Sequence, residues 1–153
     1  MTAPLPTLFV PRDREALARR LAQLEPVSPR RWGSMDPVQM LDHCAAGLEV
    51  ALGDRPARQT LLGRLVTPLI LGRVLGPHPF RRNLPTEATW ASGDPGAFEA
   101  QRLRLATLVD RFVQRGPEGA ETAVHPFFGR LGGARWGRLT YKHLDHHLRQ
   151  FGV

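Results

Sequence analysis

The sequence predicts an all-α protein, folded as a bundle of four or five helices in one domain covering residues 1–153. Three observations favour this fold. Apolar residues recur at helical spacing in four segments, which proline- and glycine-rich stretches separate. No stretch of useful length alternates polar and apolar residues, so a sheet is not expected. The chain has 153 residues and one cysteine, which is enough for a single core and excludes a disulfide framework.

The first two helices are marked by their ends. Leucines at helical spacing predict a helix over about 12–25, which Pro26 ends. The second helix is expected to start at Asp36, which is followed by a proline suited to the first helical position. Gln39 completes a capping box with Asp36, and Gly53 is a typical helix stop.

The middle of the chain is less regular. A dense apolar stretch over 60–75 predicts a helix that is broken or kinked at Pro68. The proline-rich residues 76–95 predict a long loop. A third long helix is expected to begin at Asp94-Pro95 and to end near Gly116-Pro117.

The last helix is predicted to begin near Gly133, after a loop containing HPFFG (residues 125–129), and to run almost to the C-terminus. His143 and His147 are four positions apart in it and therefore lie nearly above one another. Helical rotation places them on the apolar face, so the two imidazoles are expected to point into the bundle. That face also carries Trp136, Leu139, Thr140, Leu144 and Phe151, and the opposite face carries Arg138, Lys142, Asp145 and Arg149.

A third histidine, His43, lies in the second helix at the edge of its apolar stripe. The missing side chain at Gly47, one turn away, is expected to leave room for an ion or a substrate. Histidines four apart on a helix can hold one metal ion, and a third imidazole gives the open arrangement of catalytic zinc. His43, His143 and His147 are therefore the candidate metal ligands. The alternative is a set of hydrogen-bonded core histidines.

Other polar residues are given lesser roles. His146 is one step off the shared face and is either a neighbour of the ligands or solvent-facing. Asp145 points away from the histidine pair and is rejected as a base. Cys44 lies within its apolar stripe and is interpreted as a core residue. His78 is interpreted as a loop residue. Tyr141 and Gln150 are weak candidates for polar partners of the ligands, and a rim or surface position is the favoured interpretation of both.

Three segments carry a resemblance to a known family: MDPVQMLDHCAAGLEVALGD (35–54), HPFFG (125–129) and YKHLDHHLRQFGV (141–153). They resemble the DinB-like (YfiT-like) metalloenzyme superfamily, and most of all a branch described only as a domain of unknown function. The resemblance implies an up-down-down-up four-helix bundle, here with an extra short helix or long loop between helices 2 and 3. It also implies a frequent homodimer and a divalent metal held by His43, His143 and His147. Relatives tend to have a capping Ser or Thr where this chain has Gly132-Gly133.

The expected function is that of a metal-dependent enzyme, of the hydrolase or low-molecular-weight-thiol transferase type, acting on a small molecule. Zinc or nickel suits three imidazoles best, and iron or manganese is acceptable. The open position would face a mouth built by the loops near Trp32 and residues 125–129. Neither a general base nor a particular reaction follows from the sequence. Two alternatives stay open, a purely structural metal and a non-catalytic basic module that binds nucleic acid or an acidic partner.

Charge and hydropathy limit the partners. There are 21 Lys+Arg against 14 Asp+Glu, for a net charge of +7, but the arginines are dispersed and do not favour a nucleic-acid partner. The longest charge-free apolar run, between Arg64 and Arg73, is far short of the ~20 residues of a membrane span. The N-terminus lacks the basic start of a leader peptide. We therefore expect a soluble, cytoplasmic protein without a membrane partner.

Overall fold

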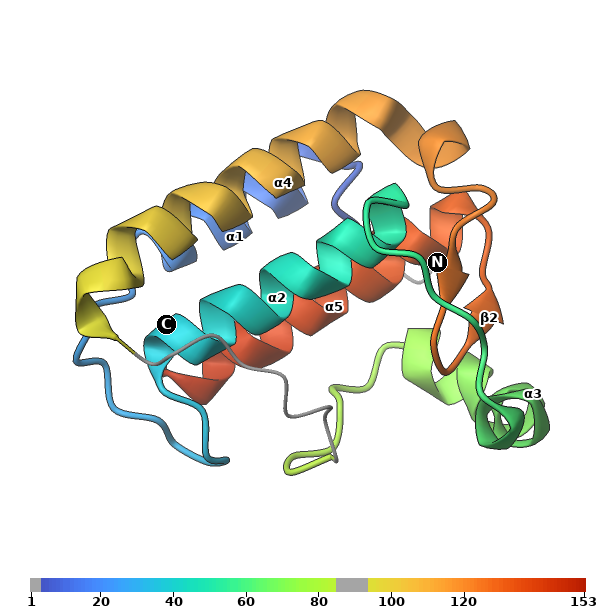
Figure 1. Ribbon diagram of the computed structural model, residues 1–153, viewed down its shortest axis with the longest axis horizontal. Coiled ribbons are helices and arrows are strands. Elements are labelled where there is room, and N and C mark those ends of the chain that lie inside the picture. The colour runs from blue at the N-terminus through green and yellow to red at the C-terminus, as the bar shows by residue number, and fades with distance from the viewer. Residues whose placement is uncertain (1–3, 85–93) are drawn as a thin grey trace.

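The computed structural model describes residues 4–84 and 94–153, which form five α-helices, a 3-10 turn and a two-stranded hairpin (Figure 1). The predicted mostly helical fold is confirmed. Within the described ranges, no helix is both long and apolar enough to cross a membrane. In chain order the elements are α1 (Pro11–Leu21), α2 (Pro37–Leu52), α3 (Leu61–Leu75), η1 (Pro95–Ala97), α4 (Phe98–Gly119), β1 (Val124–His125), β2 (Gly129–Arg130) and α5 (Gly133–Gln150).

Four of the helices, α1, α2, α4 and α5, run along one another, whereas α3 lies at one end of the molecule near the hairpin and contacts α5 (Figure 1). α2 contacts both α4 and α5, α4 also contacts α5, and α1 packs on α5. The apolar core lies between these helices because each turns its apolar stripe toward the others. Its largest fully buried side chains are Trp136, Phe98, Phe112, Leu8, Leu24, Met40, Leu41 and Leu48.

The predicted limits of α2 are confirmed. The Asp36 carboxylate accepts a hydrogen bond from the Gln39 amide (2.8 Å), and the Gln39 side chain accepts one from the Asp36 amide (3.0 Å). Gly53 ends the helix with a φ of 79°, a left-handed conformation that glycine adopts without strain. Local sequence therefore fixes both ends of the helix that carries His43.

Two helix ends differ from the prediction. α1 stops at Leu21, and Leu24 is buried from a following turn closed by a hydrogen bond from its amide to the Leu21 carbonyl. In α4 the helical backbone breaks at Gly116, as predicted, but one further turn follows to Gly119. Of the predicted loop over 76–95, residues 85–93 lie outside the described part of the chain.

The expectation that no sheet forms is wrong for one short hairpin. Val124 pairs with Arg130 and His125 with Gly129, and strands of two residues are too short to show any alternation. The hairpin leads into α5, which has no capping side chain of its own. Instead the Glu121 carboxylate accepts a hydrogen bond from the Gly133 amide (2.8 Å).

The side of α5 that was expected to be polar is largely buried, which corrects the prediction for Arg138 and Lys142. Arg138 donates to the carbonyls of Pro6, Leu75 and Gly76 at 2.7–2.8 Å. Lys142 donates to the carbonyls of Val74, Gly76 and His78. The last carbonyls of a helix have no partners within it, so these two cations satisfy and hold the C-terminal end of α3.

Candidate metal centre

Three histidines from two helices converge between α2 and α5. Nε2 of His43 lies 2.7 Å from Nε2 of His143, and one ring nitrogen from each of His43, His143 and His147 lies within 4.8 Å of the others. The ring centroids are 4.6–4.8 Å apart, with the rings nearly perpendicular. Three nitrogens bound tetrahedrally to one zinc ion would be about 3.4 Å apart, so small rotations of the rings bring this set to binding geometry.

Gly47 makes the close approach of the two helices possible. A Cβ atom at this position would lie 3.4 Å from Nδ1 and 3.5 Å from Cε1 of His143. The space beside Gly47 is therefore filled by the His143 ring, which corrects the expectation that it would accommodate an ion or a substrate. The glycine acts by letting one histidine reach another.

Gln150 holds the most buried of the three rings. Its Nε2 donates to the Trp32 carbonyl (2.9 Å), which can only accept, so its Oε1 faces Nδ1 of His147 at 2.8 Å and accepts a hydrogen bond from it. His147 therefore carries its proton on Nδ1 and presents the lone pair of Nε2 to the cluster. Gln150 is only 2% exposed, so its interpretation as a rim or surface residue is wrong.

Burial keeps the three imidazoles neutral. It lowers the pKa of His43 to about 4 and that of His147 to about 3, and it lowers the pKa of His143 well below the ordinary value. The neighbouring imidazoles lower these pKa values further, whereas Asp42 partly raises that of His43. At neutral pH the three imidazoles are consequently uncharged, the form that binds a metal.

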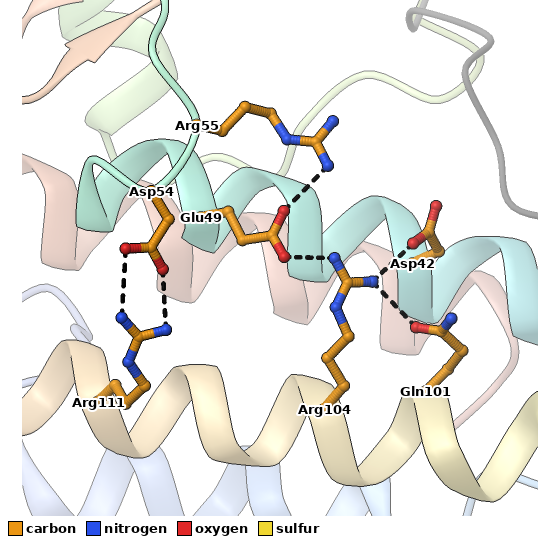
Figure 2. Close-up of polar contacts among 7 residues, drawn as sticks. All are labelled: Asp42, Glu49, Asp54, Arg55, Gln101, Arg104 and Arg111. Carbon is orange, nitrogen blue, oxygen red and sulfur yellow. Dashed lines mark hydrogen bonds and ion pairs between the residues drawn. The ribbon is translucent and has the colours of Figure 1, made fainter.

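The nearby carboxylates are engaged elsewhere. Arg104 of α4 bridges Asp42 and Glu49 on the side of α2 that faces α4, as Figure 2 shows. Asp145 pairs with Arg20 (2.7 Å) and Arg149 (3.0 Å), in agreement with its predicted direction away from the pair. Within the described residues the candidate metal group holds histidine nitrogens and no carboxylate.

His146 lies beside the cluster rather than in it. Its ring centroid is 5.1 Å from that of His147 and 5.6 and 5.8 Å from the rings of Trp32 and Phe80. Arg82 stacks over Trp32, with its guanidinium carbon 4.3 Å from the ring centre. The sequence left the role of His146 open, and the structure places it in an aromatic layer over His147.

The HPFFG loop is built around His125. Nδ1 of His125 accepts hydrogen bonds from the backbone amides of Phe127 and Phe128, both at 3.0 Å. Its ring packs against Phe128 and Trp136, and burial lowers its pKa to about 4. His125 is thus an uncharged imidazole that shapes the loop. These contacts explain its position without a role for it in the proposed mouth of the site.

The other predicted positions are readily placed. Cys44 is a core residue, as predicted, with its Sγ 3.7 Å from Sδ of Met40, and burial raises the pKa of its thiol. His78 is an exposed loop residue, also as predicted.

Two cavities, of about 240 and 170 Å³, lie away from the three histidines. One lies beside Gly53 and Val124, and the other between α1 and α4.

Comparison with known proteins gives one match. Residues 11–152 match the model of a family described as "Protein of unknown function (DUF1569)". No curated protein and no solved structure matches the chain.

Proposed function

We propose that this chain, which belongs to the DUF1569 family, is a metal-dependent enzyme in which His43, His143 and His147 bind one divalent cation. The observation that carries the proposal is the convergence of three neutral imidazole nitrogens within 4.8 Å from segments a hundred residues apart. Neutral imidazole nitrogens are common metal ligands, and three of them directed at one point from two helices form a set that a single divalent cation can share.

The donor set favours particular metals. Three imidazoles without a carboxylate suit zinc or nickel best, and iron or manganese is acceptable. Three protein ligands leave a further position open, the arrangement typical of catalytic rather than structural sites. A cation held in this way supplies Lewis acidity, which makes a nearby water or low-molecular-weight thiol a stronger acid. Hydrolysis and thiol transfer are the two reaction types consistent with it.

The chain's own residues prepare the site. Gln150 fixes the proton of His147 on Nδ1, so that Nε2 stays available as a ligand. Arg104 holds Asp42 and Glu49 toward α4, which keeps the ligand set nitrogenous. His43 and His143 are only partly buried, so this side of the cluster is where a small substrate would approach.

The DinB-like superfamily and its up-down-down-up bundle are part of the same proposal. Two features support them. Four helices run along one another, namely α1, α2, α4 and α5 (Figure 1). In chain order, the additional helix α3 comes between α2 and α4. The candidate ligands also come from α2 and α5, the two helices from which the resemblance takes them.

The direct test is metal analysis of protein purified without a histidine tag and then loaded with Zn²⁺ or Ni²⁺. We expect about one equivalent in the unaltered chain and almost none in His143→Ala. His78→Ala, which removes an exposed loop histidine, is the matched control and should bind like the unaltered chain. Less than a few tenths of an equivalent after loading would remove the proposal.

A second measurement separates a catalytic from a structural metal. Co²⁺ in the site should give a visible spectrum that changes when a small thiol or azide is added, because an exchangeable position remains open. An unresponsive spectrum, with a large fall in melting temperature on chelation, would assign the cation a structural role.

A further inference from the structure

The outward face of α3 is apolar and exposed. Leu61, Leu62, Leu65 and Leu69 are 77%, 63%, 76% and 84% exposed. At about 100° per residue, these four leucines lie within roughly 100° of the helix circumference, so they form one continuous face. Contiguous apolar surface of this kind usually marks a binding site.

The fold holds α3 by its opposite side. Gly63 and Thr67 are buried against the hairpin loop, where the Thr67 hydroxyl donates to the Phe127 carbonyl (3.1 Å). A Cβ atom at position 63 would lie 2.2 Å from the same carbonyl oxygen, so no larger residue fits there. Because Arg138 and Lys142 also bind the C-terminal end of α3, the leucine face is left free of structural duties.

Basic residues border this face. By the same rotation of about 100° per residue, Arg64 lies about 60° from Leu61, and Arg73 lies about 20° from Leu62 on the other border. Residues 56–84 contain no Asp or Glu. Their arginines are all exposed, and none takes part in the ion pairs found among the described residues: Arg58, Arg64, Arg73, Arg81 and Arg82.

This charge pattern discriminates between occupants. A symmetric contact of α3 with a second copy would bring Arg64 and Arg73 against arginines, with no acidic residue of the segment to pair with them. An anionic bilayer offers the complementary chemistry instead. Acyl chains accept the leucines, and headgroup phosphates pair with arginines at the border of the apolar face.

We propose that α3 binds the surface of an anionic lipid bilayer, with its leucine face at the headgroup–acyl boundary and Arg64 and Arg73 on phosphates. This requires no membrane-spanning segment, so it is consistent with the absence of one among the described helices, but it replaces the expectation from the sequence that the protein has no membrane partner. The proposal goes beyond the metal-dependent activity, since it gives the protein a place of action independent of its reaction.

Vesicle co-sedimentation of the full chain tests the proposal. The protein should pellet with vesicles of phosphatidylglycerol and phosphatidylcholine, less so at higher salt, and not with phosphatidylcholine alone. The double substitution Leu65→Gln/Leu69→Gln should weaken binding at least about tenfold, because two apolar side chains lose their burial. Arg64→Gln and Arg73→Gln should each weaken it about fivefold.

Matched controls lie elsewhere on the surface. Leu103→Gln removes a leucine that is 70% exposed on α4, and Arg19→Gln removes an exposed arginine of α1, and both should bind vesicles like the unaltered chain. Equal melting temperatures would show that each variant is folded. The proposal is overturned if the unaltered chain stays in solution, or if the leucine variant binds like it. It is also overturned if sedimentation reveals a dimer that only the leucine substitutions dissociate, since a second copy would then cover the face.

Discussion

α5 carries polar side chains on two sides, and the groups they meet are of opposite kinds. Toward α2, His143 and His147 are neutral bases facing another base, His43. Toward α3, Arg138 and Lys142 are cations, and each meets three backbone carbonyls. On the side of α5 that faces α3 (the cationic side), each cation meets its acceptors within the chain. On the side that faces α2 (the histidine side), three nitrogen bases meet one another.

This difference shows why a shifted pKa alone does not identify a functional residue. Burial lowers the pKa of Lys142 to about 8, which is a shift often seen in catalytic lysines. All three hydrogen atoms of its ammonium group have carbonyl partners, however, so its role is structural. His143 and His147 are distinguished by what they face, because both rings meet a third imidazole, that of His43, from another helix.

Breaking the cationic side should have the largest effect on stability. Arg138→Met leaves the carbonyls of Pro6 and Leu75 without this donor and the Gly76 carbonyl with Lys142 alone, and we expect the free energy of unfolding to fall by about 3 kcal/mol. Denaturant unfolding measures this loss. Arg135→Met is the matched control, because Arg135 is exposed on the first turns of the same helix and should change stability by no more than about 0.5 kcal/mol.

The same variant tests whether the two sides of α5 are independent. Hydrogen exchange in α3 should accelerate in Arg138→Met, while the affinity for Zn²⁺ stays unchanged. A parallel loss of metal affinity would show that the docking of α3 shapes the histidine cluster, so that the two sides of α5 are not independent.

The sequence predicted the histidine side well and the cationic side poorly, for a physical reason. The spacing of His143 and His147 and the apolar stripe around His43 are local patterns, and helical geometry converts them directly into positions. The partners of Arg138 and Lys142 are the Pro6 carbonyl and backbone carbonyls at and just after the end of α3, 62–68 residues earlier in the chain. Every residue has a backbone carbonyl, so no sequence pattern marks these particular ones as acceptors. The two cations were therefore expected to face solvent.

Two further features of the site differ in whether they could have been predicted. Gln150 follows His147 by three residues, so the two share a helix face, and this spacing agrees with the less favoured interpretation of Gln150 as a polar partner of the ligands. The filling of the gap at Gly47 by His143 depends on the distance between α2 and α5, which no local pattern contains. The exposure of α3 is similar. Apart from Arg64 and Arg73, its residues are mostly apolar all around the helix, a pattern typical of a buried helix.

Weakening the histidine side through Gln150 should have the next largest effect. Gln150→Leu removes the acceptor that fixes the proton of His147, and we expect the affinity for Zn²⁺ to fall about 10- to 100-fold. Competition with a chromophoric chelator measures this change. Gln150→Glu keeps an acceptor at the same place and should retain most of the affinity. Equal losses in both variants would indicate a packing role for Gln150 instead.

The smallest effect is expected from acid and concerns the loop that packs against α3. The pKa of His125 is lowered to about 4, below its ordinary value of 6.5, so the unfolded chain takes up a proton first as the pH falls. Stability should therefore be complete above about pH 6.5 and decrease toward pH 4, with His125 contributing a loss of roughly 1–2 kcal/mol by pH 5.

His125→Asn keeps an oxygen that can accept from the amides of Phe127 and Phe128 but cannot titrate in this range. The unaltered chain and His125→Asn share the histidines between α2 and α5. The difference between their curves of unfolding free energy against pH therefore measures the contribution of His125. Identical pH dependence in the two proteins would mean that this loop tolerates a charged ring, and acid sensitivity would then belong to the α2 side of α5 alone.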